Sequence, residues 1–173
     1  PRIRTAEDYW CQGFSEPGAG SDLASRSTRA ELRDGQYVIN GSKIWTTHAH
    51  HATHIFVLAR TDPTVKPQRG ISFLLVDMDQ PGVTIRPIQG MAGDHEVNQV
   101  FFDNAVSGSN NIIGHEGQGW TIAKFLLEHE RGGSCFGPKL LADIERIRCR
   151  ALEMPDGDDA CLADDQVFAR RLA

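Results

Sequence analysis

Short apolar stretches separated by turn residues fill the chain between about residues 27 and 113. The dipeptides Asp34-Gly35 and Asn40-Gly41 fall between the first three stretches, and such pairs supply the positive φ angles of tight hairpins. We therefore expect three antiparallel strands in a meander, then further short strands that close into a β-barrel or a β-sandwich. The stretches lie at residues 29–33, 37–39, 43–47, 55–59, 71–76, 83–85 and 100–102.

The pattern changes after Gly114, where apolar residues begin to recur at helical spacing. They do so through residues 120–127 and again through residues 140–147, which predicts two helices or one interrupted helix. Gly132-Gly133 and Pro138 lie between the two stretches, and such residues are common causes of helix kinks. We therefore expect the helical path to break or bend there.

A third, shorter helix is predicted at about residues 164–172, with Asp164 or Asp165 placed to cap its first turn. The fold class indicated is mainly β with C-terminal α-helices. The β domain covers residues 1–113, and residues 114–173 form a helical segment. Because the helices carry apolar faces with too few partners in the chain, we expect this segment to be the start of a larger helical domain.

Composition narrows the class of protein. Lys and Arg number 18 against 23 Asp and Glu, a formal net charge of -5, which disfavours a basic nucleic-acid-binding surface. No apolar run reaches the roughly 18 residues of a membrane span, and no charged-then-apolar leader is present. We expect a soluble, cytoplasmic protein, and Pro1 in place of a methionine suggests a piece of a longer chain. The cysteines show no C-x-x-C spacing, which indicates reduced, mostly buried thiols: Cys11, Cys135, Cys149 and Cys161.

The segment GFSEPGAGSD at residues 13–22 is the most unusual stretch of the chain. It cannot be the middle of a helix, because Pro17 lacks a backbone N–H donor and the three glycines of the segment carry a conformational entropy cost. Two hydroxyls and two carboxylates lie within it, directly behind the tract Tyr9-Trp10-Cys11-Gln12. We interpret it as a loop shaped around a bound group. It lacks the lysine of a P-loop, so nucleotide hydrolysis is disfavoured.

This segment, together with NGSKIWTT at residues 40–47, closely resembles the central region of the acyl-CoA dehydrogenase family of flavoenzymes. That family carries Thr/Ser-Glu-Pro and Gly-Ser-Asp, followed by N-G-x-K-x-W-[IT]-[TS]. Residues 90–104 and 114–120 resemble two later family segments in the same order. The resemblance runs from about residue 9 to residue 150.

The resemblance implies a middle-domain-like β-barrel followed by the first helices of a C-terminal bundle, with FAD held between domains. The implied reaction oxidises acyl-CoA thioesters at the α and β carbons, as in fatty acid metabolism. A carboxylate base takes the α-proton, and the β-hydrogen leaves as hydride to flavin N5. Implied partners are the acyl-CoA substrate and an electron-transfer flavoprotein or similar acceptor. The family also implies a homo-oligomer for the full-length protein and little or no activity for a fragment.

Cofactor-binding residues follow from the matched positions. Ser15 would offer its hydroxyl, and Phe14 its backbone N–H, to the pyrimidine oxygens of the flavin. Trp45 would cover one face of the ring, and the Thr47 hydroxyl would bond near N5, where negative charge develops on reduction. Thr46 points the other way, because side chains alternate along a strand.

Substrate-binding and catalytic residues are implied further along. Ser21 would approach the pyrophosphate or the pantetheine arm, and Arg131 would lie near the CoA arm. Glu130 occupies the position where a minority of the family places the catalytic base, while most members place it later in the bundle. Glu128 and Glu130 lie on nearly opposite helix faces, since successive residues rotate by about 100°. At most one of them can face a flavin.

Alternatives remain open at this point. The same fold serves acyl-CoA oxidases and nitroalkane oxidases, which let reduced flavin meet oxygen. A non-catalytic β-barrel binding module could keep the scaffold without turnover. The histidines His48, His50, His51 and His54 have no acidic or thiol partner nearby in sequence, so we predict a solvated loop and no metal site.

Overall fold

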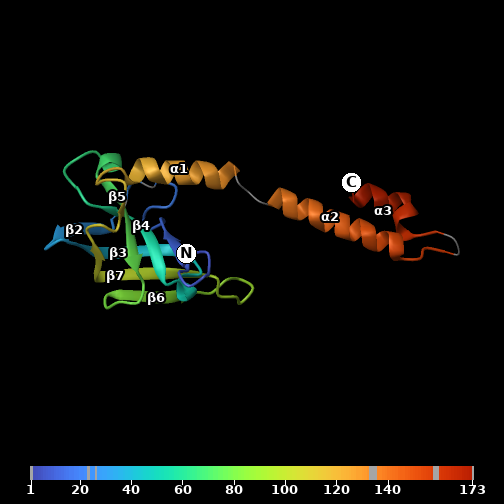
Figure 1. Ribbon diagram of the computed structural model, residues 1–173, viewed down its shortest axis with the longest axis horizontal. Coiled ribbons are helices and arrows are strands. Elements are labelled where there is room, and N and C mark those ends of the chain that lie inside the picture. Colours follow the sequence, from blue (N-terminus) through green and yellow to red (C-terminus); the bar gives the residue numbers. More distant parts are fainter. Residues whose placement is uncertain (1, 23, 26, 133–135, 158–159, 173) are drawn as a thin grey trace. The chain divides into compact units, whose positions relative to one another are not determined.

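The computed structural model describes residues 2–22, 24–25, 27–132, 136–157 and 160–172, without the side chains of residues 131, 132 and 136. The chain divides into two compact units, Pro1–Leu126 and Leu127–Ala173. In Figure 1 the strands of the first unit run from blue to yellow, and the helices of the second are orange and red.

The described residues of the first unit contain an eight-stranded sheet. Its hydrogen-bonded order is β6-β7-β3-β2-β4-β5-β8, and β1 pairs in parallel with β4 off this path. The path is open, with β6 at one end and β8 at the other, so the strands do not close into a complete barrel. The strands are β1 (Trp10–Gly13), β2 (Arg29–Arg33), β3 (Gln36–Thr47), β4 (His54–Arg60), β5 (Ile71–Asp77), β6 (Val83–Ile88), β7 (Val97–Gly108) and β8 (Ile112–Ile113).

One apolar core lies inside this curled sheet. It contains fully buried side chains from β3, β4 and β7, such as Ile39, Val57 and Val100. Alternate residues of β7 point inward, as expected for a strand with one buried face. The Ser107 hydroxyl on β7 donates to the Leu75 carbonyl oxygen on β5 at 2.6 Å, which joins strands that are not neighbours in the sheet order. The mainly β fold class is therefore confirmed.

The predicted meander is correct at its first turn and wrong at its second. Asp34 and Gly35 take φ angles of 49° and 77° between β2 and β3, as a tight hairpin requires. Asn40-Gly41, by contrast, lies inside the single 12-residue strand β3. The register with β7 shifts at this point, and the Asn40 side chain accepts a hydrogen bond from the Asn104 N–H at 2.8 Å. The pairing of β3 with the equally long β7 converts the expected turn into a bulge.

Strand β1 was not predicted, because four residues are too few to show a period. Its backbone pairs Cys11 with Ile55, and the Cys11 side chain is buried in the core. Burial raises the pKa of this thiol to about 12, so it stays protonated. The described cysteines are free, as expected, but Cys149 is exposed and Cys161 half-buried, so the prediction of mostly buried thiols is wrong. Cys135 lies outside the described residues.

Three helices follow the sheet in the described chain, as predicted: α1 (Gly119–Gly132), α2 (Phe136–Glu153) and α3 (Gln166–Leu172). The start of α1 packs on the sheet, where a Cβ at Gly119 would lie 2.6 Å from the Ser72 carbonyl carbon. Asp165 caps α3, because its carboxylate accepts a hydrogen bond from the Val167 N–H at 2.8 Å. None of the helices in the described part of the chain is both long and apolar enough to cross a membrane.

We expect Gly41→Ala to destabilise the β unit by about 1–3 kcal/mol, because of crowding and backbone strain. A Cβ at this position would lie 2.7 Å from the Thr28 Cα, and the φ angle of 146° is rare for other residues. Urea unfolding measures the change. Gly18→Ala is the matched control, since a Cβ there meets nothing within 4 Å. Equal stability of the two variants would contradict the packing described.

Candidate functional site

The 13–22 loop and strand β3 meet directly. The loop closes on itself through paired backbone hydrogen bonds between Glu16 and Ala19, at 3.0 and 3.1 Å. Immediately before this turn, the Ser15 carbonyl oxygen accepts a hydrogen bond from the Ile44 N–H at 2.9 Å. The two sequence motifs are therefore joined through backbone atoms. We call this place the loop–strand junction, comprising residues 13–22 and 43–47.

A buried ion pair holds the junction from inside. The Lys43 Nζ lies 2.6 Å from the Glu16 Oε1, and both side chains are almost fully buried. The ammonium also donates to the Leu58 carbonyl oxygen at 2.7 Å. The Glu16 Oε2 accepts hydrogen bonds from the Ser27 N–H at 2.6 Å, the Ser27 hydroxyl at 2.8 Å and the Thr28 N–H at 3.2 Å. Such satisfaction of both charges is what a buried ion pair needs to be stable.

The environment keeps Glu16 ionised. Burial alone would raise the pKa of its carboxyl group, but the charge and hydrogen bond of Lys43 and the hydrogen bonds from Ser27 and Thr28 outweigh this and lower the pKa to about 2. At neutral pH the pair is therefore a carboxylate facing an ammonium. Both residues lie within the motifs that indicated the family, but their pairing was not predicted from the sequence. The available signal was a charged residue in each motif, Glu16 in the loop and Lys43 next to the apolar residues Ile44 and Trp45.

Trp45 and Thr47 lie on the accessible side of β3. Trp45 is 59% exposed, whereas the next residue, Thr46, is fully buried and Thr47 is exposed. The expected alternation is therefore present. Trp45 also has a φ angle of 60°, within a shift of the register between β3 and β7. A bulky residue in this conformation is strained, and strained backbone positions cluster at binding and active sites.

The other predicted cofactor residues surround the same junction. Phe14 is buried, and its ring lies edge-on to Phe56 and Phe73 with centroid distances of 5.8 and 5.9 Å. It therefore anchors the loop in the core with its side chain. Ser15 is half-buried and Ser21 is exposed. The structure brings Phe14 and Ser15 next to β3, through the bond between Ser15 and Ile44.

The predicted catalytic base Glu130 and the predicted substrate-binding residue Arg131 belong to the other unit. Glu130 is exposed on α1, after Leu127, where the second unit begins. The side chain of Arg131 lies outside the part of the chain that the structure describes. These two residues and the loop–strand junction are therefore described in separate units of the chain.

The histidines differ from the predicted solvated loop. His50 and His51 belong to a short 3₁₀ turn, η1 (Ala49–His51), which His48 precedes and whose Ala49 is fully buried. The His50 ring lies 4.0 Å from the His51 ring and stacks at 4.0 Å on His95, which sequence analysis did not consider. His54 is separate, on β4, and stacks on Trp10. No group of metal-ligating side chains with suitable geometry occurs in the described residues.

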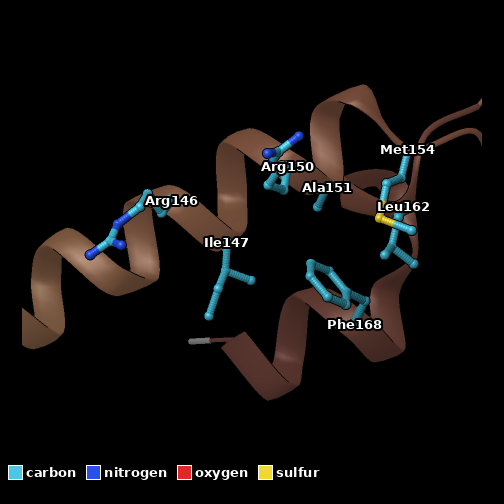
Figure 2. A pocket seen from close by; sticks show the side chains of 7 residues that line it. All are labelled: Arg146, Ile147, Arg150, Ala151, Met154, Leu162 and Phe168. Carbon is cyan, nitrogen blue, oxygen red and sulfur yellow. The ribbon is translucent and has the colours of Figure 1, made fainter.

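The helical unit carries a pocket of about 240 Å³ between α2 and the segment that follows it. Figure 2 shows the Phe168 ring facing α2 near Ile147 and Ala151. The lining contains no carboxylate or nucleophile, so the pocket offers packing surface rather than catalytic chemistry. It is lined by Arg146, Ile147, Arg150, Ala151, Met154, Leu162 and Phe168.

A curled β domain, a glycine-rich loop fixed to a bulged strand with an exposed indole, and helices that follow define a domain of the acyl-CoA dehydrogenase type. Comparison with known families agrees, since the model of the acyl-CoA dehydrogenase middle domain matches residues 11–105. The chain belongs to the acyl-CoA dehydrogenase family. The family suggested by the sequence motifs is therefore confirmed.

Relatives support this assignment over nearly the whole chain. The acyl-CoA dehydrogenase IpdE1 of Mycobacterium tuberculosis is 51% identical over 172 residues, which cover 99% of this chain and 44% of that protein. A chain of the ChsE4-ChsE5 complex from Mycobacterium tuberculosis has a TM-score of 0.79 and 31% identity, covering 99% of this chain and 44% of that chain. Glutaryl-coenzyme A dehydrogenase in complex with glutaryl-CoA has a TM-score of 0.83 and 25% identity, with the same coverage. The chain spans less than half the length of these relatives.

We expect Glu16→Gln to lower the free energy of unfolding by roughly 3–5 kcal/mol, because it leaves the Lys43 ammonium buried without a counter-charge. The double variant Glu16→Gln/Lys43→Met removes that charge and should recover most of the loss. Urea unfolding at neutral pH measures both. A double variant no more stable than Glu16→Gln would show that the buried charge is not the cause.

The ion pair also predicts a pH dependence of stability. The folded pKa of Glu16, about 2, lies below its ordinary value of 4.5, so its stabilisation is present above pH 4.5 and is lost as the pH falls towards 2. Protonated Glu16 resembles Gln. The stability difference between wild type and Glu16→Gln should therefore shrink by about 3 kcal/mol between neutral pH and pH 2. A difference that stays constant over this range would contradict the assigned pKa.

Proposed function

We propose that this chain is part of an FAD-dependent acyl-CoA dehydrogenase that oxidises acyl-CoA thioesters between the α and β carbons. The proposal rests mainly on the loop–strand junction. It combines an exposed, strained Trp45, the neighbouring Thr47 hydroxyl on the same side of the strand, and the half-buried Ser15 of the loop. Membership of the acyl-CoA dehydrogenase family supports the assignment of the reaction class.

The residues at the junction fit a flavin ring. A planar tricyclic ring needs a flat apolar surface to pack against. The Trp45 indole is 59% exposed, and its residue has a left-handed backbone conformation with a φ angle of 60°. Thr47 would direct its hydroxyl near N5, and Ser15 with the Phe14 backbone N–H would serve the pyrimidine end. Bound FAD supplies the redox chemistry by accepting the β-hydride. The chain's own residues hold the ring and favour the charge that develops on it.

Substrate binding and proton abstraction are assigned to other residues. Ser21, exposed at the end of the loop, would contact the cofactor pyrophosphate or the pantetheine arm, and Arg131 would lie near the CoA arm. Glu130 would accept the α-proton. A carboxylate enclosed by an acyl chain and a flavin has its pKa raised towards the working pH, as general-base catalysis requires. If a later segment of the protein supplies the base instead, Glu130 is a surface carboxylate.

The proposed assembly is larger than this chain. The relatives are more than twice as long, and α2 exposes apolar side chains such as Leu140 and Leu141. We assign residues 1–113 to a flavin-binding middle domain and residues 114–173 to the start of a helical bundle that continues in the longer protein. Packing of further helices against α2 would cover these side chains and the pocket in Figure 2.

Partners and setting follow from the same assignment. The proposed partners are the acyl-CoA substrate and an electron-transfer flavoprotein or similar acceptor, in the cytoplasm and in fatty acid metabolism. A homo-oligomer is proposed for the full-length protein, whereas the related ChsE4-ChsE5 structure is a complex of two named components. We expect the 173-residue chain alone to bind FAD weakly and to be inactive.

The experiment uses the full-length protein loaded with FAD. Adding acyl-CoA without oxygen should bleach the flavin absorbance, and Thr47→Ala should slow flavin reduction roughly 10- to 100-fold while acyl-CoA binding changes less, because the lost hydrogen bond matters most as N5 gains charge. Stopped-flow absorbance measures reduction. Thr46→Val is the matched control, since the buried Thr46 hydroxyl has no partner in the structure.

Each outcome separates the alternatives. Bleaching that needs no oxygen, with reoxidation by an electron acceptor and slow reaction with oxygen, supports a dehydrogenase. Rapid oxygen consumption would instead indicate an acyl-CoA or nitroalkane oxidase. A full-length protein without flavin absorbance would indicate a binding module. Equal losses of reduction rate and substrate affinity in Thr47→Ala would contradict a role near N5.

A further inference from the structure

The buried side chain of Asn98 joins four segments around the end of strand β3. Asn98 lies on β7 and is fully buried. Its Nδ2 lies 3.1 Å from the Thr46 carbonyl oxygen and 3.0 Å from the His50 Nδ1, with a longer contact of 3.5 Å to the Glu96 carbonyl oxygen. Its Oδ1 lies 2.7 Å from the His95 Nε2. One amide thus contacts β3, the η1 turn and the segment that leads into β7.

The orientation of this amide follows from its partners. A backbone carbonyl oxygen can only accept a hydrogen bond, so the atom facing Thr46 and Glu96 must be the amide nitrogen. The second N–H then points at the His50 Nδ1, which must be unprotonated to accept it. The amide oxygen faces His95, whose Nε2 must carry a hydrogen. The network therefore requires a neutral His50 with its hydrogen on Nε2.

Protonation of His50 is incompatible with this arrangement. It would place an N–H at Nδ1 directly against the amide N–H group of Asn98. Rotating the amide to accept this hydrogen would turn its oxygen towards the carbonyl oxygen of Thr46, where two acceptors repel. Rotation of the amide would therefore remove the hydrogen bond that Asn98 donates to the Thr46 carbonyl oxygen.

The segment held by this bond is the strained one. Thr46 follows Trp45, which has a φ angle of 60°, and β3 changes its register with β7 between Lys43 and Thr46. At such a bulge the regular ladder of backbone hydrogen bonds is interrupted. A side-chain hydrogen bond to the Thr46 carbonyl oxygen supports a conformation that local preferences oppose.

The charges around His50 favour its neutral form at neutral pH. His51 and His48 lie on its own turn, and His95 stacks on it from the loop before β7. Partial burial and the positive charges that these three rings can carry lower the pKa of His50 below its ordinary value. On the same turn, His48 contacts an acidic and a phenolic group, namely Glu96 at 3.9 Å and the Tyr9 hydroxyl at 2.8 Å.

We propose that Asn98 is a positioning residue that holds residues 45–47 in the bulged conformation, and that protonation of His50 releases this hold. The statement that Asn98 positions a segment that contacts flavin rests on the proposed function. The effect of His50 protonation on the hydrogen bond between Asn98 and Thr46 does not depend on flavin. Because the folded pKa of His50 is depressed, the hold is complete above the ordinary histidine pKa of about 6.5 and is lost as the pH falls through the lower folded value.

The first test measures the tautomer of His50 in the 173-residue chain labelled with ¹⁵N-histidine. Nitrogen chemical shifts at about pH 8 should show an unprotonated Nδ1 and a protonated Nε2 for His50, and a protonated Nε2 for His95. His50→Gln and His95→Gln assign the resonances. A hydrogen on the His50 Nδ1 at this pH would overturn the proposal.

The second test follows Trp45 in the same chain labelled with 5-fluorotryptophan. The three tryptophans give three ¹⁹F resonances, and Trp45→Phe identifies that of Trp45. Between about pH 8 and pH 5 the Trp45 resonance should shift in wild type. The shift should be lost in His50→Gln, which cannot titrate, and in Asn98→Leu, which cannot bond to Thr46.

The matched control is His51→Gln. This variant removes a histidine of the same turn that does not contact Asn98, so the pH-dependent shift should remain. A shift that survives in His50→Gln, or that disappears equally in His51→Gln, would show that the general charge of the cluster and not the Asn98 contact is responsible. His50→Gln leaves the Asn98–Thr46 bond intact, so the decision does not depend on whether Asn98→Leu folds.

Neither test uses flavin. The proposed effect of His50 protonation can therefore be confirmed or overturned even in a chain that does not bind FAD. Normal flavin reduction by the holoenzyme would not restore the proposal if these tests contradict it. In the full-length protein, FAD affinity should fall on acidification. This fall should be absent in His50→Gln and present in His51→Gln. If the ¹⁹F shift is present but FAD affinity does not follow this pattern, the Asn98 contact stabilises the conformation of β3 without affecting FAD binding.

Discussion

The ion pair between Glu16 and Lys43 joins two segments that are far apart in the sequence. Both charges are removed from water, so each is stable there only while the other is present and the surrounding hydrogen bonds are made. This mutual dependence fixes the bend of the 13–22 loop against β3, and the backbone bond from Ile44 to Ser15 sets their distance. The exposed residues of the junction have defined positions because their buried neighbours cannot move independently.

Strand β3 also contains a strained backbone conformation, at Trp45. Trp45 combines a left-handed backbone conformation with an exposed indole, and neither would persist without support from packed neighbours. Lys43 holds the strand before this residue and Asn98 holds it after, so the strain lies between two buried polar contacts. A large apolar surface held rigidly in this way suits the binding of a planar ring, because little conformational entropy is left to lose on binding.

Local sequence patterns predicted much of this fold and part of its site. The Asp34-Gly35 hairpin and the helix cap at Asp165 follow from residues that are close in sequence, and the family motifs identified the loop and the indole. The bulge at Gly41 could not be predicted, because it depends on the length of β7, which the local pattern does not show. The contact between His50 and His95 was missed for the same reason, since distant segments meet only through strand register.

We propose that the loop–strand junction forms one face of a flavin site. A crystal structure of the full-length protein with FAD tests it most directly. We expect the isoalloxazine ring to lie against the Trp45 indole, with flavin N5 within hydrogen-bonding distance of the Thr47 hydroxyl. The ion pair of Glu16 and Lys43 should remain intact behind them. A flavin bound elsewhere, with Trp45 covered by another protein segment, would contradict it.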